Sequence, residues 1–131
     1  MIYFVRGKKT KNIKIGFTSL SVRARISSLQ TGSPDILIFL GACPGDRVYE
    51  TQLHKLYQDD RLFGEWFKSS EKLLHFICQN CIQDIDNMEW VMSMTSNKIL
   101  SFKEAVKLDS NELNNLIRKY SWLLASRTKF R

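Results

Sequence analysis

Two short β-forming runs near the start of the chain place the strongest constraint on its fold. Residues 2–5 and 13–17 are rich in isoleucine, valine and aromatic side chains, and a polar segment that contains Gly7 and Asn12 separates them. Strand-forming residues on both sides of such a turn-forming segment are typical of a β-hairpin. We therefore predict that the chain begins with a hairpin.

Helix and strand signals then alternate along the chain. In residues 21–30 apolar side chains recur at helical spacing, and the segment 31–34 (Thr-Gly-Ser-Pro) ends that helix. Residues 36–40 form a continuous apolar run, which predicts a buried third strand. Two further helices are predicted from apolar stripes, the first made of Tyr49, Leu53 and Leu56 and the second of Leu73, Leu74, Ile77, Cys78 and Cys81.

This order of elements predicts an α+β fold for residues 1–87, with a small three-stranded sheet, mixed or antiparallel, flanked by helices. Residues 88–131 are predicted to form a helical extension. Ser101 and Glu104 have the spacing of a capping box, and the segment 109–112 repeats it. Two helix starts so close together resemble a helix-turn-helix.

The composition sets limits on the class of protein. A chain of 131 residues buries one core and has no room for two full-sized domains. No apolar run approaches the length of a membrane helix, and the first residues do not resemble a signal peptide. We therefore expect a protein that is not secreted and has no membrane partner, cytoplasmic or, in a eukaryotic host, nuclear. The net charge of +7 favours a polyanionic partner, although a solvated basic surface explains it equally well.

The three cysteines fit a reducing compartment better than a disulfide scaffold. Cys78 and Cys81 form a C-x-x-C pair three residues after His75, but no fourth zinc ligand stands at a sensible spacing. We interpret both cysteines as core residues of a helical stripe.

Short motifs follow one another in a fixed order over the first two-thirds of the chain. They are Ile2-Tyr3, Lys14-Ile15-Gly16, Arg25, Leu29-Gln30-Thr31-Gly32-Ser33-Pro34, Pro44-Gly45, Glu50, Leu53-His54, Arg61 and Gly64-Glu65-Trp66-Phe67. In this order and spacing they resemble the GIY-YIG nuclease superfamily, in its compact branch where KIG stands in place of YIG. The resemblance implies an endonuclease that hydrolyses DNA phosphodiester bonds with Mg²⁺ or Mn²⁺.

Such a reaction needs a base to activate water, a cation to balance charge on the phosphoryl oxygens, and usually a metal held by a carboxylate. By resemblance, Tyr3 is the general base, Arg25 stabilises the transition state and Glu50 is the metal ligand. A free phenol is a poor base at neutral pH, so a positive group must stabilise its phenolate. Lys14, across the hairpin, is the candidate, and the role of the family's second tyrosine does not carry over to it. Without the resemblance, a packed aromatic and an exposed lysine explain Tyr3 and Lys14.

Other residues near these motifs have alternative roles. His54 lies one helical turn after Glu50, where it orients Glu50, holds a water or contacts the phosphate, or else packs locally. Arg23 lies on another face of the helix from Arg25 and is expected to contact phosphate at most. Arg61 reaches a phosphate or forms a salt bridge within the domain.

The match to the family is poor at Glu65, which is a second acidic group or a surface residue in our interpretation. The aromatic pair Trp66 and Phe67 follows a glycine, and such a pair more often anchors a sheet edge than stacks on a base.

The extension supplies further candidates for DNA contact. The exposed side of its second predicted helix carries Asn114, Asn115, Arg118 and Lys119, whose amide and cationic groups are suited to read bases in a major groove. Arg127, Lys129 and Arg131 would add phosphate contacts. A helical hairpin packed on the nuclease core, or an arm that forms a homodimer, explains the same periodicity. For the whole chain, a DNA-binding regulator with a nuclease fold but weak or no catalysis is the alternative to an endonuclease, and a protein-interaction module is a third.

Overall fold

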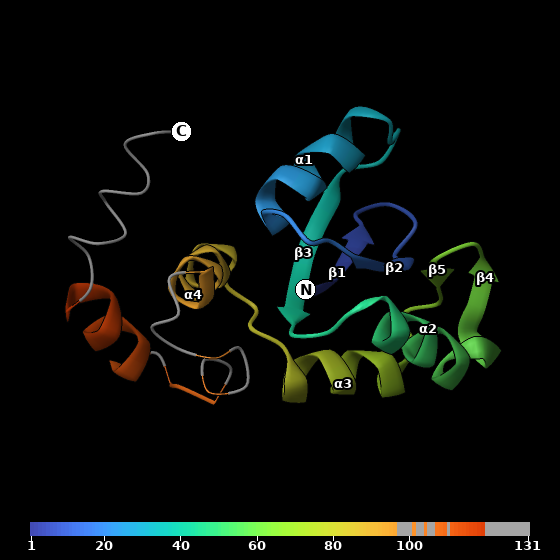
Figure 1. The fold of residues 1–131 in the computed structure, drawn as a ribbon. Coiled ribbons are helices and arrows are strands. Elements are labelled where there is room, and N and C mark those ends of the chain that lie inside the picture. Colours follow the sequence, from blue (N-terminus) through green and yellow to red (C-terminus); the bar gives the residue numbers. More distant parts are fainter. Residues whose placement is uncertain (97–100, 102–103, 105–106, 110, 120–131) are drawn as a thin grey trace.

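The structure, a computed structural model, describes residues 1–96, 101, 104, 107–109 and 111–119 (Figure 1). The strands within these residues form one sheet in the order β3-β1-β2-β5-β4. Their bounds are β1 Ile2–Gly7, β2 Ile13–Phe17, β3 Leu37–Cys43, β4 Arg61–Phe63 and β5 Trp66–Phe67. Every neighbouring pair is antiparallel. The predicted hairpin is confirmed as β1 and β2, and the third predicted strand is confirmed as β3.

The expected number of strands was wrong, because the sheet has five strands in the described residues rather than three. The two additional strands form a tight hairpin around Gly64, whose φ of +53° lies in the left-handed region that favours glycine. β5 pairs with β2 through Ile13 opposite Phe67 and Lys14 opposite Trp66. Strands of two and three residues are too short to give a periodic pattern in the sequence.

The helices lie on both faces of the sheet (Figure 1). They are α1 Val22–Thr31, α2 Arg47–Leu56, α3 Glu71–Asn80 and α4 Ile85–Ser96, and a short 3-10 turn η1, Gln58–Asp60, precedes β4. The three helices predicted before residue 87 are thus confirmed, and the described part of the chain is an α+β fold. The boundary predicted after residue 87 falls inside α4.

Alternate residues of β1 belong to two separate hydrophobic cores. Ile2 and Phe4 pack with residues of α2 and α3, such as Leu53 and Leu73, on one face of the sheet. Tyr3 and Val5 point to the other face, which α1 and α4 cover. Because successive side chains of a strand point to opposite faces, the single strand β1 anchors both helical layers.

Three residues predicted for buried stripes are exposed instead. Leu56, the last residue of α2, is 54% exposed, and Leu74 and Cys78 of α3 are also exposed. Among the predicted residues of α2 only Leu53 is buried, and among those of α3 only Leu73 and Ile77 are buried. The buried stripes of both helices are therefore narrower than expected. Cys78 is therefore not a core residue.

The extension begins as its capping signals predict. The Ser101 N–H donates to a Glu104 carboxylate oxygen at 3.2 Å, and the Glu104 N–H donates to the Ser101 hydroxyl at 3.2 Å, which confirms the capping box. Residues 111–119 are helical, and Leu113 is buried against Val91 and Met94 of α4. The apolar side of this helix, with Leu113, Leu116 and Ile117, therefore packs within the chain. Arg127, Lys129 and Arg131 lie outside the described residues.

Within the described part of the chain, none of the helices has the length and hydropathy to cross a membrane.

Candidate active site

Tyr3 lies opposite Gly16 on the face of the sheet that α1 covers. The phenol ring lies across the glycine so closely that a Cβ atom at position 16 would stand 2.3 Å from the ring carbon Cζ. Tyr3 is fully buried. The glycine of the KIG motif therefore makes room for the tyrosine ring, and this contact fixes where the phenol hydroxyl lies.

Arg25 reaches the Tyr3 hydroxyl from α1. Its Nε donates to the phenol oxygen at 3.4 Å, while the rest of the arginine is exposed. The hydrogen bond to Tyr3 and the negative charge of a Tyr3 phenolate, together with the charge of Glu65, raise the pKa of Arg25. The fixed guanidinium is thus held beside the phenol with donors left for a phosphate.

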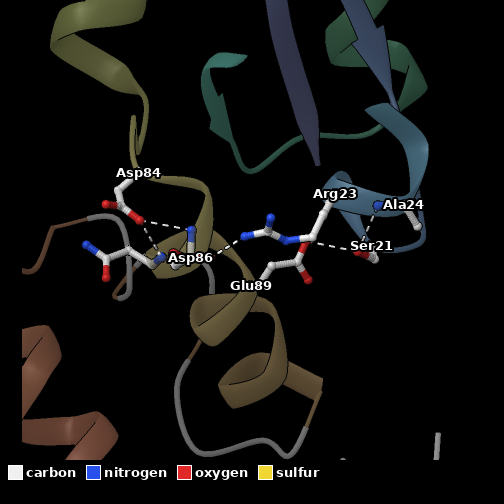
Figure 2. A network of polar contacts seen from close by, with 7 residues as sticks. Ser21, Arg23, Ala24, Asp84, Asp86 and Glu89 are labelled. Atoms are coloured by element: carbon white, nitrogen blue, oxygen red, sulfur yellow. Dashed lines mark hydrogen bonds and ion pairs between the residues drawn. The ribbon is translucent and has the colours of Figure 1, made fainter. Parts of the chain in front are cut away.

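Arg23, two residues earlier, points to a different partner. Its guanidinium forms an ion pair with Asp86 of α4, and its backbone N–H donates to the Glu89 carboxylate at 2.9 Å (Figure 2). The Ser21 hydroxyl donates to the same Glu89 oxygen at 2.9 Å. Glu89 therefore satisfies free donors at the start of α1, where a negative charge is favoured. In this structure Arg23 helps to join α1 to α4.

Lys14 and Glu65 form an ion pair beside Arg25. The Lys14 Nζ lies 2.7 Å from a Glu65 carboxylate oxygen and 5.9 Å from the centre of the Trp66 ring. The pairing of β2 with β5 brings these residues together, since Lys14 stands opposite Trp66. The sequence alone leaves Glu65 as either a second acidic group or a surface residue. The structure makes it the direct partner of Lys14.

Glu50 and His54 approach the same region from α2. Glu50 is buried, with 9% of its surface exposed, and its Oε1 lies 3.8 Å from the His54 Nε2. The same Nε2 lies 3.0 Å from the carbonyl oxygen of Ile15 in β2, and because a carbonyl only accepts, Nε2 is the nitrogen that donates. His54 therefore ties α2 to β2 and holds its ring next to the Glu50 carboxyl.

The carboxyl groups of Glu50 and Glu65 interact with each other, and their pKa values move in opposite directions. Burial, followed by the negative charge of Glu65, raises the pKa of Glu50, and His54 opposes the rise. Burial acts in the same sense on Glu65, but its hydrogen bond and ion pair with Lys14 outweigh it and lower the pKa of Glu65. Two carboxyl groups at one site with pKa values pushed apart are typical of functional sites.

These shifts predict a pH dependence of stability. The folded-state pKa of Glu50 is raised, so its contribution to stability is fully present below the unfolded pKa and is lost as the pH rises through the folded pKa. Glu50→Gln keeps the neutral form at every pH. We therefore expect the variant to unfold at a higher temperature than the wild type at neutral pH, and the gain to disappear toward about pH 4, near the ordinary pKa of glutamate.

Thermal unfolding followed by circular dichroism at several pH values measures this effect. Lys14→Met is the contrasting variant, because the lowered pKa of Glu65 depends on Lys14. A lowered pKa contributes stability at pH values above the pKa that Glu65 has in the unfolded chain. That variant should lose stability at neutral pH and approach the wild type in acid. A Glu50→Gln protein that is less stable than the wild type at neutral pH would contradict the assignment.

The remaining predicted residues lie on the β4–β5 hairpin and on the helix 111–119. Arg61 is exposed, and its Nε donates to the Gly64 carbonyl at 2.7 Å, which braces the turn between β4 and β5. Phe67 is buried in the core, as expected of a sheet anchor. The four extension residues Asn114, Asn115, Arg118 and Lys119 are exposed on the helix 111–119.

The described interactions relate six side chains, which we call the contact chain. Arg25 donates to Tyr3, Lys14 pairs with Glu65, and Glu50 lies beside His54. The charge of Glu65 acts on both Arg25 and Glu50 and relates the three pairs to one another. Within the part of the chain that the structure describes, no three His, Cys, Asp or Glu side chains are arranged to hold a metal ion among themselves. Comparison with protein-family models, curated proteins and solved structures finds no match to the chain.

Proposed function

We propose that the chain is an endonuclease of the GIY-YIG type that hydrolyses DNA phosphodiester bonds with Mg²⁺ or Mn²⁺. The observation that carries the proposal is the chain of contacts from Tyr3 to His54. It gathers a phenol, a guanidinium, an ammonium group, two carboxyl groups and an imidazole from five separate elements, β1, β2, α1, α2 and the β4–β5 turn. Phosphodiester hydrolysis calls for these kinds of groups.

Each side chain has a role in this proposal. Arg25 binds a phosphate oxygen through the donors that Tyr3 does not use, and neutralises charge that develops during attack. Tyr3, as its phenolate, takes the proton of the attacking water. The cation that contacts its oxygen is Arg25, whereas Lys14, the cation that the sequence assigns to it, pairs with Glu65. Because Tyr3 is fully buried, side chains around its hydroxyl must move before water can reach it.

The carboxyl groups at the site fit a hard divalent cation. The charge on Glu65 raises the pKa of Glu50, and a cation bound to Glu50 would relieve that repulsion. Mg²⁺ needs only one or two carboxylates, because water and phosphate oxygens complete its shell. Glu50 would be the ligand, and the bound ion would supply positive charge to the phosphoryl oxygens. His54 holds Glu50 in place through the contact on α2.

Cleavage of DNA by the purified full chain tests the proposal. We expect cutting that requires Mg²⁺ or Mn²⁺, and we expect Arg25→Ala to reduce it by about 10²–10³-fold, the usual effect of removing one group that stabilises transition-state charge. Lys55→Ala is the matched control, because it removes one exposed positive charge from α2 outside the cluster. Equal cleavage by wild type and Arg25→Ala would contradict the role of Arg25.

The burial of Tyr3 and the ion pair of Lys14 favour a second function, a DNA-binding regulator with weak or no catalysis. A regulator of this kind would bind DNA with a salt-dependent affinity, and would cut no linear, supercoiled or branched DNA with either Mg²⁺ or Mn²⁺.

A further inference from the structure

A pocket of about 500 Å³ opens beside the candidate active site. It lies between the β1–β2 turn, the second half of α1 and the β4–β5 hairpin. Its volume is within the range of pockets that take small organic groups. Lys14 lines one wall, so the pocket and the contact chain from Tyr3 to His54 share a residue.

Two aromatic side chains form the side of the pocket that faces α1. Phe63 on the edge strand β4 is 67% exposed, which is unusual for so large an apolar group, and Trp66 on β5 is half-buried. Leu29 of α1 lines the pocket on the other side. Apolar and aromatic walls of this kind accept a flat ring by stacking, and bases stack on such side chains with little regard to their identity.

Polar groups at the rim are suited to the edge of a base. Asn12 and Ser28 both line the pocket, and among the described residues neither side chain has a hydrogen-bond partner. An amide both donates and accepts, and so does a hydroxyl. Together they match the mixed donors and acceptors that a nucleobase presents on its Watson–Crick edge.

The position of the pocket relates it to the chemistry of the site. Ser28 stands one helical turn after Arg25 on α1, a rise of about 4.5 Å along the helix. A nucleotide with its base in the pocket would therefore carry its phosphate toward Arg25. Lys14, on the opposite side, holds Glu65, which interacts with Glu50.

We propose that this pocket binds an unpaired nucleobase next to the phosphate that is cut, so that the preferred substrate is single-stranded DNA or DNA with an unpaired nucleotide. This inference rests on the proposed function for the identity of its ligand. A base within a duplex has both ring faces stacked and its Watson–Crick edge occupied, so it cannot use the aromatic wall and the polar rim together. The basic net charge of the chain attracts either form of DNA, and the pocket selects between them.

Binding of the full chain to a short fluorescent single strand and to the corresponding duplex, without divalent metal, tests the inference. We expect tighter binding of the single strand. Phe63→Ala should weaken it by about tenfold to a hundredfold, the usual effect of losing one stacking platform. Leu62→Ala is the matched control, because Leu62 is the neighbouring exposed residue of β4 and does not line the pocket.

A second pair of variants tests the opposite wall by filling the space. Ser28→Trp places a large ring in the pocket and should weaken single-strand binding to the same degree. Ser27→Trp adds the same bulk at an exposed position of α1 outside the pocket and should leave binding unchanged. Duplex binding should differ little among the four variants.

The outcomes separate this inference from the proposed function. Equal binding of single strand and duplex, unaffected by Phe63→Ala and Ser28→Trp, would overturn the pocket even where the wild type cuts DNA. Selective loss of single-strand binding in those two variants would support the pocket even where the wild type cuts nothing, in which case the proposed nuclease activity is the part that fails.

Discussion

Replacing Glu50 by glutamine is expected to lower metal-dependent DNA cleavage by about a thousandfold while the protein stays folded and binds DNA. The substitution keeps the shape of the side chain and removes its negative charge. A bound metal contributes several kcal/mol of transition-state stabilisation, and each 1.36 kcal/mol or so corresponds to a tenfold change in rate. Glu50 is the buried carboxyl group of the site, between His54 and Glu65.

Two measurements separate loss of the metal ligand from loss of structure. Single-turnover cleavage gives the chemical rate, and thermal unfolding gives the stability, which we expect to rise at neutral pH because burial disfavours the charged carboxylate. A more stable and less active variant is the pattern expected when a functional group is held in a destabilising environment.

Glu71→Gln is the control for the charge change itself. Glu71 lies exposed in the first turn of α3, away from the contact chain that begins at Tyr3. It should cut DNA at the rate of the wild type. A cleavage rate of Glu50→Gln within a few-fold of the wild-type rate would rule out Glu50 as the metal ligand. Glu65 would then be the next candidate.

The parts of the fold that the sequence predicted are those with a periodic pattern. Apolar residues at helical spacing predicted α1, and the two β-forming runs predicted β1 and β2, because local periodicity reports which side of an element is buried. The β4–β5 hairpin escaped prediction, since β5 has only two residues and is held by its pairing with β2. That pairing joins positions that are far apart in the sequence, and no pattern in a single sequence indicates it.

The same limit applies to the candidate site. The motifs indicated Tyr3, Arg25 and Glu50, but the use of Glu65 follows only from the pairing of Lys14 with Trp66, which places Glu65 against the Lys14 ammonium group. Arg23 shows the converse, because its engagement with α4 depends on a helix more than 60 residues further along the chain. Residue type predicted what each group can do, whereas tertiary contacts decide which groups act together.

Gly16→Ala is expected to destabilise the protein by about 2–3 kcal/mol, the upper part of the usual range for overpacking a core. The added methyl group would stand 2.3 Å from Cζ and 2.4 Å from the hydroxyl oxygen of Tyr3, so the ring must move. Tyr3 is fully buried and its hydroxyl accepts from Arg25, so a shift of the ring also shifts the group against which Arg25 is held. The substitution should therefore lower cleavage as well as stability. Chemical denaturation of the full chain measures the first effect.

Two further variants establish that the tyrosine ring is the cause. Gly32→Ala adds the same methyl group at the end of α1, where nothing lies within 4 Å of the new Cβ, and should leave stability nearly unchanged. In a Tyr3→Leu background the ring is gone, so Gly16→Ala should cost less than it does in the wild type, and the difference is the coupling energy of the pair. An equal cost in both backgrounds would show that the glycine is needed for another reason. A large coupling would mean that the glycine of the KIG motif serves the candidate site by fixing the phenol against which Arg25 is held.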